Sequence, residues 1–522
     1  MIKINNKIML LVAFLIVLNL VPIWFFAYPP LQDYPQHLIQ DKIIMDYQNK
    51  EFDYSKYFDL RFSLIPTLFS IFSIISLSKI FGIYIAGKIF LSIYVILFPL
   101  SIFYFLSAVD RRKAILGFFS FIFTYNWFFN KGLVDFAISL PFFFFALGYW
   151  LNNRNKMTIS KILISTILVL LTLFSHLFSF IILMISVFLV QIFRYKNKKQ
   201  AFTTSIPFIL PIILFAIFWF SRSPDVAPID VLAAFNPLVL IKSFFGMFLS
   251  FSPVLEAILL AAPLLYFAFL FLRKILANKP FSIKRLFDKK YKNEFLILAL
   301  ILLLLFVISP PDLKTWAHFK IRFVPFIVLF FVAWLEPPTK KRLFMFITVI
   351  AAVLLVILTF FNYYSINKDF ADYSSGINIV ERNKSILPIT VKDLYGYTMR
   401  PYEHFWAYYH IEKGGAGPYI FAGHSTHLIS YRENMPAPQA IINAQSFYWQ
   451  PSSRITPSAP GELYPQLNFS REILSYYDYI LLWGKSNDVE SAVIDSGFSL
   501  LHEKGDLKVY ENVKNFSPIL DW

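Results

Sequence analysis

The first group with evident chemistry is the carboxylate of Asp33, which lies early in the loop 28–83 after the first apolar run. Pro35 suits the first turn of a helix, so Asp33 or Tyr34 would occupy the helix N-cap. A capping carboxylate stabilises a helix end, whereas a carboxylate beside a bilayer can also act as general base toward a hydroxyl group. The sequence leaves both interpretations open.

Two further titratable residues follow on the same predicted helix. His37 and Asp41 are four residues apart and therefore share one helix face. Together with Asp33 they could position an acceptor or hold a divalent cation, because carboxylates and imidazole are metal ligands. The alternative is a solvated surface helix.

A second segment with polar residues, Asn126 to Phe136, joins two apolar runs. Lys131 could hold a phosphate, and Asp135 could supply a second acidic group. The alternative is a short loop in which Gly132 provides the turn.

Four basic residues gather before a late apolar run: Lys314, His318, Lys320 and Arg322. Arginine is suited to bidentate phosphate contacts, so Arg322 is a candidate phosphate ligand, with Lys320 as the alternative. Arg322 could instead reach lipid headgroups. Because these residues are predicted to lie outside the cytoplasm, where basic residues are sparse, we favour the functional interpretation.

His176 separates the apolar runs 159–175 and 177–193. Such a stretch is too long for one span and short for two, which predicts a tight helical hairpin with His176 at its outer turn. Polar residues at membrane depth tend to be functional. The alternative is an imidazole bonded to a nearby carbonyl.

The elements that must position these residues are membrane helices. Of the 522 residues, 57% are hydrophobic and only 15% are charged, and the mean hydropathy is +0.59. Ordinary soluble domains carry about 25% charge, so the composition indicates a multi-span membrane protein. The absence of Cys excludes disulfides, thiolate metal sites and Cys nucleophiles. The apolar runs predicted to span are 8–27, 84–108, 114–130, 133–151, 159–175, 177–193, 203–220, 252–272, 294–309, 321–336 and 343–362.

Charge distribution sets the predicted topology. Segments 1–7, 109–113, 152–161, 194–202, 273–294 and 336–342 hold most of the basic residues of the first 364. The positive-inside rule therefore places them and the N-terminus in the cytoplasm, which requires about 11 spans and leaves the segment 62–80 on the outer membrane surface.

The last part of the chain has a different composition. We predict a transmembrane domain, residues 1–364, and a soluble extracytoplasmic α/β domain, residues 365–522, which is slightly acidic. Strands are predicted at 386–391, 418–421 and 477–483, and a hairpin at 498–510 around Gly505-Asp506.

Several function classes lack their signatures. The sequence contains no G-x-x-x-x-G-K-[ST] loop, no G-x-G-x-x-G, no H-E-x-x-H and no G-x-S-x-G. These absences disfavour ATP-driven transport, zincin chemistry and serine hydrolysis. The excess of basic residues is explained by the cytoplasmic loops, so we expect no nucleic-acid partner.

One span, a long outer loop with an early Asp, and helices lying on the membrane resemble the multi-span, lipid-sugar-dependent glycosyltransferases of the GT-C superfamily. That superfamily includes protein mannosyltransferases and aminoarabinose transferases. The resemblance implies that Asp33 is the base or the acceptor-positioning carboxylate. It also implies that a late basic residue, here Arg322 or Lys320, holds the donor phosphate.

The leading hypothesis is an inverting membrane glycosyltransferase of cell-envelope glycan biosynthesis in the cytoplasmic (inner) membrane. It would move a sugar from a polyprenyl-phosphate donor to a lipid or glycan acceptor at the outer face, among membrane lipids. Asp33 would act on the acceptor, and Arg322, with Lys131 or Lys320, on the leaving phosphate. No cofactor is required by the sequence, although a divalent cation could bind. The alternatives are a lipid or solute transporter, a non-catalytic scaffold of the same fold, and a polymerase or ligase of lipid-linked glycans.

Overall fold

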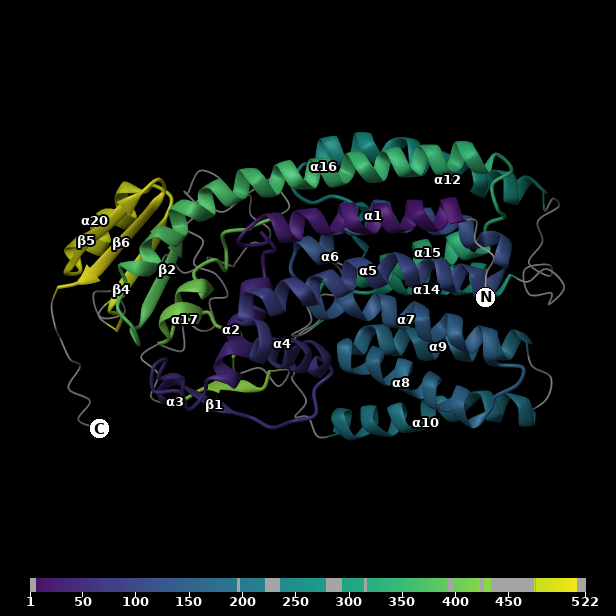
Figure 1. Cartoon of the computed structure of the whole chain (residues 1–522), viewed down its shortest axis with the longest axis horizontal. Coiled ribbons are helices and arrows are strands. Elements are labelled where there is room, and N and C mark those ends of the chain that lie inside the picture. Colours follow the sequence, from purple (N-terminus) through teal and green to yellow (C-terminus); the bar gives the residue numbers. More distant parts are fainter. Residues whose placement is uncertain are drawn as a thin grey trace. The chain divides into compact units, whose positions relative to one another are not determined.

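The computed structural model describes residues 6–194, 198–220, 235–277, 293–313, 317–392, 399–422, 427–432, 474 and 476–513. Helices dominate, and a small sheet is built from the last part of the chain (Figure 1). The chain divides into two compact units. The first comprises Met1–Phe25, Leu64–Phe72 and Lys88–Phe361, and the second comprises Phe26–Ser63, Ser73–Gly87 and Asn362–Trp522.

Seven helices of the described residues are long and apolar enough to cross a membrane. Each must satisfy its backbone hydrogen bonds internally, because lipid offers none. They are α1 (Asn6–Phe25), α5 (Ile83–Val109), α7 (Val134–Asn153), α9 (Leu177–Arg194), α10 (Lys198–Phe220), α12 (Pro253–Ala277) and α16 (Lys341–Tyr373). Shorter apolar helices accompany them: α4 (Leu68–Phe81), α8 (Ile159–Ser175), α11 (Pro237–Gly246), α14 (Glu294–Ile308) and α15 (Val324–Trp334).

Many polar side chains within these helices find partners without water. Hydroxyls bond to carbonyls one turn earlier, as Thr172 does to Leu168 O at 2.9 Å. Others join neighbouring helices: the hydroxyls of Ser139 and Ser179 are 2.6 Å apart between α7 and α9. Such bonds fix helix contacts where the hydrophobic effect gives little preference.

The helical hairpin predicted around His176 is confirmed. α8 ends at Ser175 and α9 begins at Leu177, so one extended residue, His176, makes the turn. α8 packs against α7, α9 and α10, which lie beside it in Figure 1.

The run 114–130, predicted to be one membrane helix, has a different structure. A 3-10 helix, η1 (Arg111–Phe123), is followed after a break by the short helix α6 (Trp127–Asn130). A 3-10 helix rises about 2.0 Å per residue, so its 13 residues reach about 26 Å where an α-helix would reach about 20 Å. Hydropathy identified the apolar run but could not identify the tighter winding.

The second unit contains a four-stranded sheet with the order β2-β4-β6-β5, in which β2 and β4 are parallel and the other pairs antiparallel. The predicted strands at 386–391 and 477–483 and the 498–510 hairpin are confirmed. Gly505 adopts a positive φ of +60° in the hairpin turn, which suits glycine. The strands are β2 (Ile386–Thr390), β4 (Tyr479–Trp483), β5 (Phe498–Lys504) and β6 (Leu507–Asn512).

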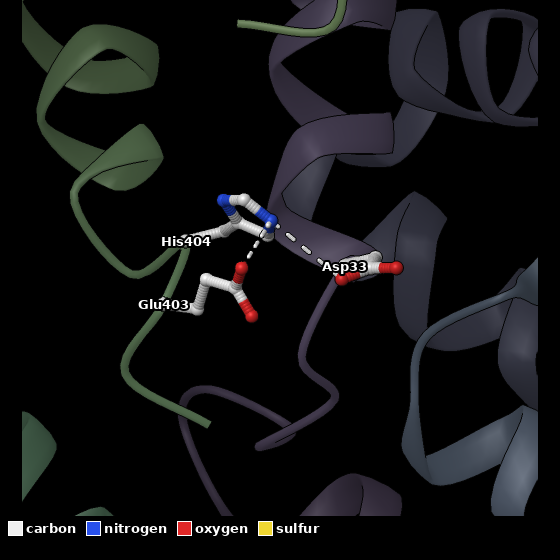
Figure 2. Close-up of side chains that lie close together, drawn as sticks. All are labelled: Asp33, Glu403 and His404. Atoms are coloured by element: carbon white, nitrogen blue, oxygen red, sulfur yellow. Dashed lines mark ion pairs between the residues drawn. The ribbon is translucent and has the colours of Figure 1, made fainter. Parts of the chain in front are cut away.

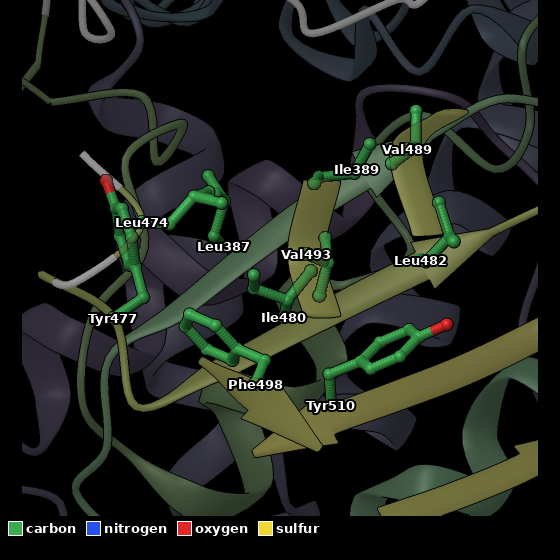
Figure 3. Packing of buried hydrophobic residues seen from close by; sticks show 10 residues of the cluster. All are labelled: Leu387, Ile389, Leu474, Tyr477, Ile480, Leu482, Val489, Val493, Phe498 and Tyr510. Atoms are coloured by element: carbon green, nitrogen blue, oxygen red, sulfur yellow. The ribbon is translucent and has the colours of Figure 1, made fainter. Parts of the chain in front are cut away.

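The sheet has its own hydrophobic core (Figure 3). Ile480 and Leu482 of β4 are fully buried and pack with Val489 and Val493 of α20 (Asn487–Asp495). β4 is therefore a central strand, as its uninterrupted apolar sequence predicts. The remaining members are Leu387, Ile389, Leu474, Tyr477, Phe498 and Tyr510.

The early loop belongs to the same unit as this sheet. α2 (Tyr34–Met45) packs against α17 (Ala407–Lys413), and β1 (Phe58–Leu60) pairs antiparallel with β3 (Ile429–Tyr431). A helix packing and a strand pairing thus join segments that are hundreds of residues apart in the sequence.

The strand predicted at 418–421 is wrong. These residues form a turn and a bend, and their backbone groups bond to a side chain instead of a neighbouring strand. Tyr419 O accepts a hydrogen bond from the Gln36 amide, and Phe421 N–H donates to the same amide. This arrangement contributes to the first candidate site.

Candidate functional site

Asp33 occupies the N-cap position of α2, as the sequence predicts, but its side chain does not act as a cap. The Gln36 N–H donates to Asp33 O at 3.1 Å, and Pro35 lies in the first turn. Among the described residues, the Asp33 carboxylate makes no hydrogen bond to the N–H groups that it would cap. The helix therefore begins without help from this carboxylate, which is buried with 8% of its residue surface exposed.

The Asp33 carboxylate instead faces an imidazole. His404 Nε2 lies 3.6 Å from Asp33 Oδ1 and 4.0 Å from Glu403 Oε1 (Figure 2). Glu403 and His404 precede α17, and the packing of α17 on α2 brings them to Asp33. We call Asp33, Glu403 and His404 the carboxylate–imidazole site.

The Gln36 amide holds the His404 ring in one orientation. Gln36 Oε1 accepts from Phe421 N–H at 3.1 Å, and Gln36 Nε2 donates to Tyr419 O at 2.7 Å. These two backbone partners fix which end of the amide is the NH2 group, and that group lies 3.0 Å from His404 Nδ1. Because an amide NH2 can only donate, Nδ1 is the acceptor and the ring proton is on Nε2, facing the two carboxylates.

Glu403 is held by a second amide. Gln32 Nε2 donates to Glu403 Oε2, while Gln32 Oε1 accepts from Arg400 N–H at 3.1 Å. Two glutamines of the early loop therefore orient the two side chains that α17 brings to Asp33.

The ligand atoms of this site lie within 4.8 Å of one another, close enough for a shared metal ion. The ring orientation does not fit one. A histidine that binds a metal through Nε2 needs its proton on Nδ1, and that N–H normally donates to an acceptor. Here Nδ1 faces the Gln36 NH2 group, a donor. His404 is therefore not a metal ligand in this arrangement, and we assign the site no step through a metal.

The cation site suggested by Asp33, His37 and Asp41 is not formed. Among the described residues, the group whose ligand atoms are close together contains Asp33, Glu403 and His404, and neither His37 nor Asp41. Asp41 lies eight residues beyond Asp33, which corresponds to about 12 Å along the helix axis. Asp41 is buried and His37 partly buried.

A second polar group lies in the first unit around Arg322, in the 3-10 turn η4 (Lys320–Phe323) before α15. The Arg322 side chain is buried, with 7% of the residue exposed. Nη2 donates to Ala317 O at 3.2 Å, and the guanidinium lies over the Phe136 ring, 5.0 Å from its centre. Nε has no hydrogen-bond partner among the described residues. A buried guanidinium with an unused N–H can bind an anion.

His176 contacts the same guanidinium. Its Nε2 is 3.1 Å from Arg322 Nη1, and its Nδ1 accepts from Phe178 N–H at 3.1 Å. The Phe136 ring packs edge-on against the imidazole. Burial, and secondly the charge of Arg322, hold the pKa of His176 well below its usual value, so the ring is neutral. We call Arg322 and His176 the arginine–imidazole pair.

Asp135 lies in the first turn of α7 and is buried. Its Oδ1 accepts a hydrogen bond from Ser70 Oγ, and its charge, like that of Asp312, interacts with Arg322. Gly132, with φ of +81°, makes the turn that leads into α7. The structure thus brings Asp135, His176 and Arg322 together, as their shared location at predicted outer span ends suggests.

His318 has a left-handed backbone, with φ of +58°, an uncommon conformation for a residue other than glycine. Its N–H donates to Asp312 Oδ1, and its ring packs edge-on against Trp127. Burial first, and then the charges of Lys131 and Arg322, lower the pKa of His318 to about 3. Lys131 and His318 therefore lie within electrostatic range of each other.

Lys320 is engaged elsewhere. Its ammonium donates to Val307 O of α14 at 3.2 Å and lies 5.4 Å from the Phe306 ring centre. Lys320 and Arg322 thus contact different groups, and the geometry favours Arg322 as the phosphate candidate. Lys314, the fourth basic residue of this cluster, lies outside the described residues.

The residues that the sequence did not reveal are Gln36, Glu403 and His404. The available signal was weak: an adjacent Glu-His pair in an aromatic-rich stretch of a chain with 8 His. The aromatic side chains around that pair are buried and pack the unit: Tyr402, Phe405, Trp406, Tyr408 and Tyr409.

These features define a multi-pass, helical membrane protein with a small C-terminal α/β region. Comparison with solved structures finds the same fold in ArnT from Cupriavidus metallidurans bound to undecaprenyl phosphate. The TM-score is 0.52 at 8% sequence identity, over 98% of this chain and 99% of that chain. The apo state of ArnT matches with a TM-score of 0.47 and 10% identity, over 98% of each chain. No protein-family model matches the chain, and no curated protein sequence matches it. The likeness establishes the GT-C-like fold that the sequence predicts.

Proposed function

We propose that this protein is a membrane glycosyltransferase that moves a sugar from a polyprenyl-phosphate donor to an acceptor hydroxyl. The observation that carries the proposal is Arg322, a buried guanidinium with an unused Nε–H in a GT-C-like fold. Undecaprenyl phosphate is the natural probe, because the ArnT structure of the same fold holds it.

The reaction is a single displacement at the anomeric carbon. The acceptor oxygen forms the new bond to that carbon as the bond to the phosphate oxygen breaks, so the configuration inverts. The electron pair of the broken bond leaves with the polyprenyl phosphate, and the acceptor proton moves to a base. Donors aimed at the leaving phosphate stabilise the charge that develops there.

Arg322 suits the leaving phosphate, with Lys131 adding positive charge. A guanidinium stays cationic and can donate more than one hydrogen bond to a phosphoryl group. Lys131 already acts electrostatically on His318, which also interacts with Arg322. The phosphate would thus meet two cations in the first unit.

Asp33 suits the acceptor proton. Its carboxylate makes no capping hydrogen bond to α2, and His404 Nε2 lies 3.6 Å from Asp33 Oδ1. A neutral N–H donor orients the carboxylate without neutralising its charge, so the carboxylate can act as a base toward a hydroxyl proton. His404 is then a positioning residue and Asp33 the base.

The test uses the full chain in lipid nanodiscs with sugars linked to undecaprenyl phosphate. We expect release of undecaprenyl monophosphate with an acceptor extract, and binding of undecaprenyl phosphate without one. Arg322→Met should weaken this binding by about thirtyfold or more, because it removes a buried charge partner. Arg112→Met is the matched control, since Arg112 is exposed and pairs with Asp110.

The products separate the alternatives. Binding without sugar release, under every donor and acceptor tested, would support a scaffold or transporter and contradict the proposal. With a glycan linked to polyprenyl diphosphate as the donor, release of the polyprenyl diphosphate would instead support a polymerase or ligase.

We also propose that the protein lies in the cytoplasmic (inner) membrane with its N-terminus inside and residues 365–522 outside. The support is the clustering of basic residues in the predicted inner segments. A reporter fused after Trp522 should be active only in the extracytoplasmic compartment, and cytoplasmic activity would overturn the 11-span topology.

A further inference from the structure

The start of α5, residues 83–87, ends at a glycine that has no room for a side chain. Gly87 is buried, and Tyr34 Oη of α2 occupies the place that a Cβ atom of residue 87 would take. Tyr34 Cζ and Leu38 Cδ2 lie only 3.1 Å and 3.0 Å from the same place. Glycine weakens a helix interior relative to alanine, and the close approach of α2 accounts for a glycine at this position.

The Tyr34 side chain has no space to move away from this glycine. It is 1% exposed, and its hydroxyl has no hydrogen-bond partner among the described residues. A phenol ring is rigid, and a close-packed interior leaves no empty volume beside it. A side chain at residue 87 would therefore displace the backbone of α2 at Tyr34, which directly follows Asp33 in the chain.

The start of α5 also contacts α17. Tyr84 Oη donates to Glu412 Oε1 of α17 at 2.6 Å, and the ring centres of Tyr84 and Tyr408 are 5.8 Å apart. Residues 83–87 belong to the same unit as α2 and α17. The start of α5 therefore contacts both of the helices whose packing brings the carboxylate–imidazole site together.

We propose that the start of α5 positions the carboxylate–imidazole site, with Gly87 as the positioning residue. Because Gly87 has no side chain, Tyr34 can lie against α5, and this contact sets where α2 begins. The start of α2 in turn sets the distance of 3.6 Å between Asp33 Oδ1 and His404 Nε2. The inference rests on the proposed function for the role of Asp33 as the base. A displacement of about 1 Å can lower a rate by about 10²-fold, even when the substitution lies away from the reacting atoms.

A double substitution separates this contact from a general loss of packing. Gly87→Ala adds the Cβ atom, and Tyr34→Phe removes the oxygen that this atom would meet. In the double variant the nearest remaining atoms of Tyr34 and Leu38 lie 3.1 Å and 3.0 Å away, so they need to move by only a few tenths of an ångström. Gly246→Ala in α11 is the matched control, because its Cβ atom would lie 3.9 Å from Ile321 Cδ1, an ordinary contact.

The experiment measures kcat and KM for sugar transfer by the full chain in nanodiscs, together with undecaprenyl phosphate binding and the melting temperature. We expect Gly87→Ala to lower kcat by about tenfold to 10²-fold while lipid binding stays unchanged, because the base is displaced and the phosphate ligand is not. Tyr34→Phe alone and Gly246→Ala should turn over like the wild type, and the double variant should regain most of the lost kcat.

A second measurement reports the geometry of the site without turnover. In protein labelled with 15N-histidine, the signals missing from His404→Gln identify His404. We expect these signals to shift in Gly87→Ala and to return toward their wild-type positions in the double variant. Such shifts in a chain that transfers no sugar would support the positioning role and contradict the proposed function, so the two can fail separately.

Two results would overturn the inference. The first is an unchanged kcat together with unchanged His404 signals in Gly87→Ala. The second is an equal loss of kcat in Gly87→Ala and in the double variant, because the Tyr34 hydroxyl would then not be the group that the added atom displaces.

Tyr84→Phe covers the case in which Gly87→Ala does not fold. It keeps the ring and removes the hydrogen bond to Glu412, so the start of α5 loses one contact with α17. We expect kcat to fall by about threefold, the range for a single hydrogen bond, and the His404 signals to shift. An unchanged kcat with unchanged His404 signals would overturn the inference.

Discussion

Two buried imidazoles, one in each unit, both place Nδ1 beside an N–H group, and their Nε2 atoms lie beside groups of opposite charge. His404 Nδ1 accepts from the Gln36 amide, and His176 Nδ1 accepts from Phe178 N–H. In His404 the ring proton is therefore on Nε2 and faces the carboxylates of Asp33 and Glu403. Nε2 of His176 instead lies 3.1 Å from the Arg322 guanidinium.

The difference lies in the charge of the group that each imidazole contacts. At the carboxylate–imidazole site, a donor meets acceptors, and the group can hold a carboxylate in place to receive a proton. At the arginine–imidazole pair, the imidazole lies beside a cation, and Arg322 Nε–H has no hydrogen-bond partner among the described residues. Under the proposed function, proton transfer takes place in the second unit and phosphate binding in the first.

The largest expected effect is the loss of turnover when Asp33 is substituted. Asp33→Asn should lower the rate of sugar transfer by about 10²-fold or more, as expected for a lost general base. The melting temperature should not change, because the side chain makes no capping bond in the described structure. Sugar release by the purified variant measures the first effect. Asp46→Asn is the control, since Asp46 lies at the other end of α2 and pairs with Lys42.

A smaller effect is expected at His404, which positions Asp33. His404→Ala should lower kcat by about tenfold with KM nearly unchanged, because the base remains and loses its orienting N–H. His404→Gln, which keeps a donor near the Nε2 position, should recover part of the loss. Steady-state kinetics of the wild type and the two variants distinguish a positioning role from a packing defect. A packing defect would impair His404→Gln and His404→Ala equally.

Metal binding should not depend on His404. Titration calorimetry with Zn2+ or Mn2+ should give the same stoichiometry for the wild type and for His404→Ala, because the Gln36 NH2 group keeps the proton on Nε2. A metal ion bound by the wild type and lost in the variant would show that the Gln36 amide reverses, and it would make this site a metal centre.

The smallest effect concerns pH. The pKa of His318 is lowered to about 3, so the folded state resists protonation that the unfolded chain accepts near pH 6.5. The contribution of His318 to the free energy of unfolding should be fully present above about pH 6.5 and should be lost progressively as the pH falls toward 3. His318→Asn should decline less, since Asn tolerates the left-handed backbone. Scanning fluorimetry should show that the melting temperature falls by about 1–3 °C more for the wild type than for His318→Asn between pH 7.5 and pH 5. An equal fall in both proteins would contradict the assignment.

Hydropathy and turn signals predict much of the fold. Apolar runs located α1, α5 and α7, and the Gly505-Asp506 pair located the β5–β6 hairpin. The 3-10 winding of η1 was not predictable, since a period of 3.0 and one of 3.6 both suit a uniformly apolar run. Arg322 was found because a basic residue at an outer span end departs from the charge trend.

The carboxylate–imidazole site could be predicted only in part. Asp33 was found from its place in the loop, but its partners lie far away in the sequence: Gln36 and His404 are 368 residues apart. Local patterns carry no information about which distant segments meet, and here the meeting depends on the packing of α2 on α17. The orientation of the His404 ring depends on the Gln36 amide, which the backbone groups of Tyr419 and Phe421 hold in place. These two residues lie in the segment 418–421, for which the sequence predicted a strand.

The division of labour between the two units is tested most directly by undecaprenyl phosphate binding to Asp33→Asn and Arg322→Met, measured side by side in nanodiscs. We predict that Asp33→Asn binds the lipid like the wild type although it transfers no sugar at an appreciable rate, and that Arg322→Met loses about thirtyfold or more in affinity. Weak binding by Asp33→Asn together with normal binding by Arg322→Met would contradict the account.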